Sequence, residues 1–433
     1  MGQLDRRSLL IGSAGLALAA CTKGASESDP EASSGPKIHR PEEGNAVTAD
    51  DAAALRDRLN EAFRSGDADQ LVELIDPEDF ALDDVRKRWS RRFENFDRLG
   101  FVKGEWFVGV PGGRTRNAAG GAVEYSGSLV FAHRVEGADA QPVVETYASK
   151  FRKASEDAPL ELMHLGEPTE HYDPAFWDVA DIDAIETKHA RIAFRKGDAA
   201  TAARVKGQIE SGAAKAFDLM PRPKGVSKVF YALTWPGIDG RLWGGVAVGD
   251  ARAHAYYHSF VDPSALAKGQ EKPTDTKGLP KGTGRVGMHQ DSLDSDTERT
   301  ACHEAIHILA NQWLTSGGAP QWASEGLATW GDRGAGRVMQ EYGGQIRSAF
   351  GRFAAMYEKD PFDVDFYAKN QDVRWENYLC SAAIFACLED TKGRSAVFDT
   401  AQEFYSSSTG ASDDPTVDRT QQIMARTRTW LDV

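Results

Sequence analysis

The sequence predicts an α+β fold in which helices and strands occupy separate stretches of the chain. Apolar residues recur at helical spacing from Thr48 to about residue 99, and strand-like alternation then dominates residues 101–165. Mixed signals fill residues 168–290, and helical spacing returns in the remainder. This order predicts an N-terminal domain of helices on a sheet, followed by a small mixed sheet and a mainly helical region.

The first 21 residues are predicted to be a targeting segment outside the fold. Arg6 and Arg7 precede a twelve-residue apolar run that ends at Ala20, too short to span a bilayer. The run closes with Leu18-Ala19-Ala20-Cys21, which resembles a bacterial lipobox. The resemblance implies export, lipid attachment at Cys21, and anchoring on the extracytoplasmic face of the cell membrane. An ordinary secretory signal is the alternative.

Residues 22–47 are rich in Ser, Glu, Gly and Pro and predict a disordered tether. The first domain, residues 48–167, begins with Thr48 as a predicted N-cap, and Gly66 ends the first helix. Its further predicted elements are helices over 68–75 and 82–99 and strands over 101–110, 122–135, 143–151 and 160–165. Helices followed by a curved antiparallel sheet resemble the cone-shaped fold of the nuclear transport factor two superfamily.

Residues 168–433 are predicted to form the second domain. Strands are expected over 187–195, 227–234, 244–248, 251–258 and 285–290, with an alanine-rich helix over 198–219 and a loop over 269–284. The acidic stretch 291–300 is expected to start a helix that runs to about Trp313, since acidic residues favour a helix N-terminus. Further helices are expected over 340–359 and 378–389.

The most specific motif is His303-Glu304-Ala305-Ile306-His307, an HExxH pattern inside a predicted helix. Residues i and i+4 lie on one face of a helix, so both imidazoles can reach one metal ion. A catalytic zinc site takes three protein ligands and keeps one position open, and the glutamate can take a proton from water there. His303 and His307 are therefore predicted metal ligands, and Glu304 is the predicted general base.

A third ligand is predicted 18 residues after His307. The run Trp322-Ala323-Ser324-Glu325-Gly326-Leu327-Ala328-Thr329-Trp330 resembles the third-ligand helix of gluzincin metallopeptidases. The resemblance implies a peptidase-MA-like domain in which Glu325 completes a zinc site and a peptide or protein substrate is hydrolysed. Gly326 is expected to let the helix of the two histidines approach closely. Better-known relatives carry an acidic residue one turn after the third ligand, where this chain has Thr329.

The same resemblance implies further site residues. In this clan an edge strand before the zinc helix binds extended substrate backbone, and residues 285–290 are the candidate strand, with His289 as a candidate substrate contact. In some of these families a tyrosine on a later helix stabilises the oxyanion. Tyr378 is the candidate here, with Tyr367 as the second choice.

Composition limits the partners. A chain of 433 residues with 41% hydrophobic and 27% charged residues is typical of a globular protein of two or three domains. The net charge of -14 argues against a nucleic-acid partner. Cys302, Cys380 and Cys387 either include one disulfide from Cys302 or are three small buried residues. The oligomeric state is not predicted.

Two other functions stay open at this stage. The first is a non-catalytic, zinc-stabilised binding lipoprotein, which would need the metal but not Glu304. The second is a small-molecule enzyme in the N-terminal domain, for which His133 and His164 are the only indications.

Overall fold

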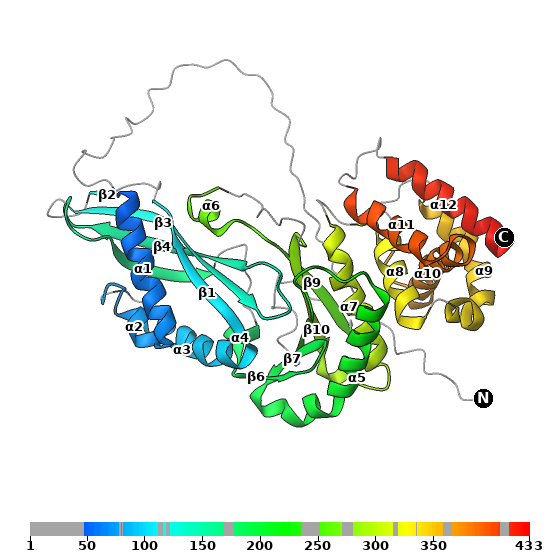
Figure 1. Cartoon of the computed structure of the whole chain (residues 1–433), viewed down its shortest axis with the longest axis horizontal. Helices are drawn as coiled ribbons and strands as arrows, with labels where there is room; N and C mark the ends of the chain where they lie inside the picture. Colours follow the sequence, from blue (N-terminus) through cyan, green and yellow to red (C-terminus); the bar gives the residue numbers. More distant parts are fainter. Residues whose placement is uncertain are drawn as a thin grey trace, which may run out of the picture.

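The computed structural model describes residues 47–433 apart from 78, 80, 111–115, 118–121, 169–175, 236–251, 271–279, 315–318, 335, 358–365 and 408–414. One sheet and its helices lie at one end of the molecule, a second sheet lies in the middle, and a group of helices lies at the other end (Figure 1). The fold class is α+β, as predicted. The predicted targeting segment, with Cys21, and nearly all of the predicted tether lie outside the described residues.

Three helices and an antiparallel sheet form the N-terminal half. In α1 (Ala49–Ser65) the Thr48 hydroxyl accepts the Asp51 N–H while the Asp51 carboxylate accepts the Thr48 N–H, which confirms the predicted start of the helix. Gly66 ends α1 at a φ of 68°. The sheet order is β1-β3-β4-β5, with β2 paired to β3. The further elements are α2 (Ala68–Val72), α3 (Leu82–Leu99), β1 (Phe101–Val108), β2 (Arg116–Asn117), β3 (Val123–Val135), β4 (Val143–Lys153) and β5 (Glu161–Pro168).

Aromatic side chains fill the space between α3 and this sheet. Trp89 of α3, Trp106 of β1 and Phe131 of β3 are fully buried, and their ring centres lie 5.1–5.3 Å apart. Large aromatic groups contribute much of the burial energy of such a core. The cluster therefore fixes the helix layer on the sheet.

The second sheet is mixed, as predicted, with the order β6-β7-β8-β10-β9. Strands β7, β8 and β10 are parallel, while β6 and β9 run antiparallel at the two sides. The predicted edge strand over residues 285–290 was wrong, because β10 pairs with β8 on one side and β9 on the other. Among the described residues, β9 is the edge nearest the histidine helix. The strands are β6 (Ile182–Glu186), β7 (Ala190–Arg195), β8 (Val229–Thr234), β9 (Ala253–Ser259) and β10 (Gly282–His289).

The two faces of this second sheet belong to two different cores. On β8, Val229 and Leu233 pack with the helices that follow, whereas Phe230 and Ala232 pack with Trp177 and the N-terminal half. Alternate residues of a strand point to opposite faces, so one strand serves both cores. The N-terminal half thus covers the face of the sheet that the C-terminal helices leave open.

A buried ion pair strengthens this contact between the halves. Arg285 of β10 donates to Asp139, which follows β3, at 2.9 Å, and both side chains are almost fully buried. The Thr283 hydroxyl also donates to Asp139, at 2.9 Å. Removing one partner of a buried pair leaves an uncompensated charge, so both halves constrain each other here.

Helices dominate the C-terminal half, and α5 and α8 flank the histidine helix α7 (Figure 1). The main helices are α4 (Phe176–Val179), α5 (Ala199–Leu219), α6 (Pro263–Ala267), α7 (Thr297–Ala310), α8 (Gln321–Arg333), α9 (Arg337–Tyr357), α10 (Gln371–Lys392), α11 (Arg394–Ser406) and α12 (Pro415–Leu431). Short 3₁₀ turns cover residues 196–198, 290–292 and 311–313.

Several predicted boundaries differ from the structure. Strand β6 and helix α6 were not expected, and α10 begins seven residues before the predicted start at Tyr378. Helix α7 begins at Thr297 and not at residue 291, because the Asp294 and Asp296 carboxylates pair with Arg252 instead of capping a longer helix. The predicted strand over 244–248 lies outside the described residues.

The structure distinguishes between the two alternatives for the cysteines, one disulfide or three buried thiols. Cys302, Cys380 and Cys387 are buried free thiols, so they are small core residues and none forms a disulfide with another. In the part of the chain that the structure describes, no helix is both long enough and apolar enough to span a membrane.

Candidate metal centre

Helix α7 holds both histidines of the motif in a fixed place. Every residue from Thr300 to Ala310 is buried. A Cβ on Gly212 of α5 would lie 2.3 Å from a carbonyl oxygen of α7, and a Cβ on Gly331 of α8 would lie 2.4 Å from Ile306. Glycine at these two contacts lets α5 and α8 approach α7 closely. The imidazoles therefore sit on a helix that is packed from both sides.

Helix α8 brings Glu325 to the same place. Its side chain is fully buried, as is that of His303, and His307 is 5% exposed. The predicted reason for Gly326 was wrong, because its nearest neighbours belong to α10: a Cβ there would lie 2.7 Å from the Ser381 carbonyl oxygen. Close approach of α10, and not of α7, requires this glycine.

Three ligand atoms form a triangle of the right size for a metal ion. His303 Nε2 lies 3.1 Å from His307 Nε2 and 3.2 Å from Glu325 Oε2, and His307 Nε2 lies 3.5 Å from that oxygen. A tetrahedral zinc ion with bonds of about 2.0–2.1 Å holds its ligand atoms about 3.3 Å apart. His303, His307 and Glu325 can therefore hold a metal ion.

An aspartate that sequence reasoning missed orients the first histidine. Asp332 Oδ2 lies 2.8 Å from His303 Nδ1. If Nδ1 carries the proton for this bond, His303 Nε2 presents its lone pair to the centre. Asp332 lies seven residues after Glu325, two turns along α8 on the same face. The expected position, Thr329, is one turn too early, so a search at spacing i+7 would have found the residue.

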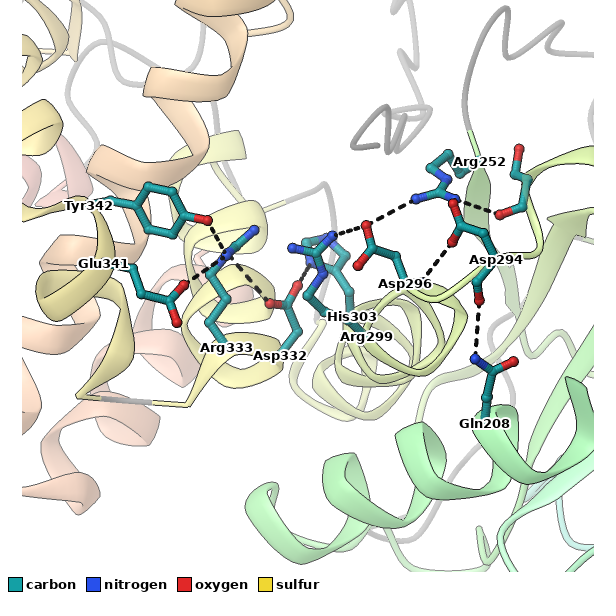
Figure 2. A network of polar contacts seen from close by, with 11 residues as sticks. Gln208, Arg252, Asp294, Asp296, Arg299, His303, Asp332, Arg333, Glu341 and Tyr342 are labelled. Carbon is teal, nitrogen blue, oxygen red and sulfur yellow. Dashed lines mark hydrogen bonds and ion pairs between the residues drawn. The ribbon is translucent and has the colours of Figure 1, made fainter. Parts of the chain in front are cut away.

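A network of charged groups extends from this aspartate (Figure 2). Arg333 Nε lies 3.9 Å from Asp332, and its guanidinium lies 4.9 and 4.8 Å from the ring centres of Tyr342 and Trp375. On the α7 side, Arg299 pairs with Asp296 at 2.9 Å. Burial lowers the pKa of Arg299, and the charge of Asp332 opposes this change. The carboxylate that orients His303 thus lies near two cations, the buried side chain of Arg333 and the partly exposed one of Arg299.

The other two ligands also have supporting hydroxyl groups. Ser324 Oγ lies 3.3 Å from His307 Nδ1, and the Tyr405 hydroxyl of α11 lies 3.4 Å from Ser324. The Tyr367 hydroxyl donates to Glu325 Oε1 at 2.7 Å, which leaves Oε2 directed to the histidines. Partners of this kind fix the orientation of metal ligands.

The electrostatics of the centre attract positive charge. Burial alone would lower the pKa of His303, but hydrogen bonds to Asp332 and Glu325 outweigh it and raise the pKa to about 10. Burial would raise the pKa of Glu325, but the imidazoles of His307 and His303 hold it well below its usual range. The cluster therefore favours a bound cation, either a proton or a metal ion.

Glu304 is buried beside the ligands. Its side chain is fully buried, and neither carboxylate oxygen has a hydrogen-bond partner among the described residues. Burial raises the pKa of Glu304 to about 7, against the opposing effect of the two imidazoles. A buried carboxylate without a partner is costly, so its presence next to a metal-ligand cluster points to a chemical task.

The structure gives the positions of the remaining predicted site residues, Tyr378, Tyr367 and His289, but does not test their predicted roles. The Tyr378 ring centre lies 6.4 Å from that of His303, and burial raises the pKa of Tyr378 well above its usual value. Tyr367, the second choice, makes the contact with Glu325. His289 is half-buried at the end of β10, opposite Thr234 of β8. The oxyanion role of Tyr378 and the substrate role of His289 stay predictions.

The geometry defines a buried His-His-Glu centre that can hold a metal ion, with a further carboxylate at its side. A scan against protein-family models finds no match for this chain, and a search of curated proteins finds none either.

Proposed function

We propose that the protein is a zinc-dependent peptidase of gluzincin type. The observation that carries this proposal is the convergence of three ligand atoms beside Glu304, a buried carboxylate without a hydrogen-bond partner among the described residues. Two histidines and one glutamate are a ligand set that zinc uses in catalytic sites, because they leave one coordination position open. A purely structural site gains nothing from a further acidic group that binds no metal.

The roles of the residues follow from their positions. Zinc bound to such ligands polarises a carbonyl oxygen and lowers the pKa of a bound water. Glu304 takes the proton from the attacking water and later delivers it to the leaving amine. In the protein without metal, burial raises the pKa of Glu304 above the usual value of a glutamate. Tyr378, buried beside the centre, is the candidate donor to the oxyanion.

Strand β9 replaces residues 285–290 as the candidate for substrate binding. Its outer side is unpaired among the described strands, and it packs near α7. An extended peptide can add to such an edge through backbone hydrogen bonds. The substrate of this proposal is therefore a peptide or an extended protein segment.

The proposal includes a lipid anchor on the membrane, and a non-catalytic binding lipoprotein is its alternative. The lipobox-like segment ending at Cys21 supports a lipid anchor on the extracytoplasmic face of a bacterial membrane. The alternative is a non-catalytic binding lipoprotein stabilised by the metal. Both functions need His303, His307 and Glu325, and only the peptidase needs Glu304.

A direct test uses the zinc-loaded protein and its Glu304→Gln variant with a proteome-derived peptide library. The expected result is cleavage by the wild type, a loss of about 10²–10⁴-fold in the variant, and equal zinc content in both. Mass spectrometry of the products and of the bound metal provides the readout. Equal cleavage by both proteins would exclude Glu304 as the general base. No cleavage by folded and zinc-loaded wild type would favour the binding lipoprotein.

A further inference from the structure

One face of α10 carries a second polar side chain beside the metal centre, that of Arg374. Tyr378 follows Arg374 by one turn, so both residues lie on the same face of the helix. That face points to the centre, because the ring of Tyr378 lies 6.4 Å from the rings of both His303 and Tyr367. Arg374 therefore lies one helical turn from the residues that surround the ligands.

The guanidinium of Arg374 has one donor, Nε, that makes no hydrogen bond within the described structure. The residue is half-buried, and its Nε is buried with no hydrogen-bond partner in the described part of the chain. The nearby Arg352 differs, since it donates to Glu376 at 2.6 Å. Arg333 donates through Nη1 to the Tyr342 hydroxyl at 3.1 Å, although its Nε and Nη2 also lack a hydrogen-bond partner among the described residues. Placing a charged donor out of water without a partner is unfavourable, so this position favours an anion.

The charge of Arg374 affects the hydroxyl of Tyr378, the candidate oxyanion donor. Burial raises the pKa of Tyr378, and the charges of Glu325 and Glu304 add to the rise, whereas the charge of Arg374 opposes it. The Tyr378 hydroxyl thus feels the carboxylates of the centre and the guanidinium together. Arg374 is thus a positive group that acts on the same hydroxyl as the carboxylates of Glu325 and Glu304.

We infer that Arg374 binds a carboxylate of the substrate and so determines which peptide bond reaches the centre. This inference rests on the proposed function and adds a substrate class to it. A guanidinium binds a carboxylate through two parallel hydrogen bonds, which fixes orientation as well as distance. In a peptide that carboxylate is either the C-terminal group or the side chain of an acidic residue.

The experiment measures binding separately from cleavage. Immobilised, zinc-loaded Glu304→Gln protein is incubated with a proteome-derived peptide library, in which half of every peptide is amidated at its C-terminus. Mass spectrometry then measures the retained peptides. We expect retention of peptides with the required carboxylate to exceed that of their neutral counterparts by about ten- to hundredfold. The double variant Glu304→Gln/Arg374→Met should lose this preference for peptides with the carboxylate.

Two variants control the result. Lys392→Met removes an exposed charge at the far end of α10 and should keep the preference. Arg374→Lys keeps the charge but loses the two-pronged donor, and should keep part of it. Zinc content and thermal unfolding are compared for every variant. Arg374→Lys decides the question if Arg374→Met does not fold.

The pattern of loss identifies the source of the carboxylate. A preference lost on amidation assigns the C-terminal group, and a preference lost when Glu is replaced by Gln assigns an acidic side chain. A preference that depends on neither, a preference unchanged in both Arg374 variants, or retention of no peptide overturns the inference. If Glu304→Gln retains carboxylate peptides that the wild type does not cleave, the peptidase proposal fails and the carboxylate site stands.

Discussion

Two buried charged clusters of this protein differ in where their positive charge comes from. In the N-terminal half, fully buried Arg92 of α3 donates to Glu145 at 2.7 Å and to Asp178 at 2.5 Å. His133 lies 3.0 Å from the other oxygen of Glu145, and the Tyr147 hydroxyl donates to Glu145. This cluster contains its own cation and is held together by it.

At the candidate metal centre, no arginine or lysine of the described residues lies against Glu304. Glu304 and Glu325 are fully buried next to two imidazoles that are uncharged when they bind metal. Arg333 lies near Asp332, but no arginine or lysine of the described chain pairs with Glu304. Two carboxylate charges match one divalent cation. The two clusters thus differ in that Arg92 lies against the carboxylates of the first, whereas Glu304 of the second has no arginine or lysine partner among the described residues.

The sharpest test makes the same substitution in both clusters. Glu145→Gln removes one of the two carboxylates that pair with buried Arg92 and should lower the free energy of unfolding by about 3 kcal/mol. Glu304→Gln removes a buried carboxylate without a partner, so the stability of the metal-free protein should stay within about 0.5 kcal/mol or rise. Urea unfolding of both variants checks this. Similar losses in the two variants would show that the clusters do not differ in the way described.

Metal removal should affect one cluster and leave the other intact. A ligand that binds only the folded state at a hundred times its Kd adds about 2.7 kcal/mol to the free energy of unfolding. Thermal unfolding with zinc and with a chelator should show a shift of this order in the wild type and in Glu145→Gln. Glu325→Ala should show none. A zinc-dependent shift that persists in Glu325→Ala would place the metal elsewhere.

The support of His303 should appear in metal affinity. Asp332→Asn removes the charge that orients this imidazole and should weaken zinc binding by about ten- to hundredfold. Thr329→Val is the matched control, because Thr329 is also buried on α8 and lies one turn before Asp332. Competition with a chromophoric chelator gives both affinities. A larger loss in Thr329→Val than in Asp332→Asn would contradict the assignment.

Local signals predicted much of the fold and of the centre. The cap at Thr48, the end of α1 at Gly66 and the limits of α3 depend on neighbouring residues, and the sequence contains them. The spacing of His303 and His307 is likewise local. Their meeting with Glu325 required a family pattern, because it depends on how two helices pack.

Long-range packing explains what could not be predicted. The contact between Asp332 and His303 depends on how α8 packs against α7. Gly326 was predicted to contact α7, but in the structure it contacts α10. Strand β10 loses its edge position to β9, which pairs with it from more than twenty residues away. Sequence patterns fix the face of an element but not which partner covers it.

The smallest expected effect is the pH dependence of the stability that Glu145 contributes to the Arg92 cluster. Burial would raise the pKa of Glu145, but Arg92, His133 and Tyr147 outweigh it and lower the pKa from 4.5 to about 2. Because the folded-state pKa is depressed, this stabilisation is complete above about pH 4.5 and is lost as the pH falls toward 2. From pH 7 to pH 4 the loss amounts to about 1 kcal/mol.

Other carboxylates also titrate in this range, so the measurement is a difference between two proteins. The gap in unfolding free energy between wild type and Glu145→Gln should narrow by about 1 kcal/mol from pH 7 to pH 4, because glutamine cannot titrate. Urea unfolding in the presence of a chelator keeps the metal centre out of the comparison. A gap that stays constant over this range would mean that the charge of Glu145 does not stabilise the cluster. The difference between the Arg92 cluster and the candidate metal centre would then be supported only by the measurements on the metal centre.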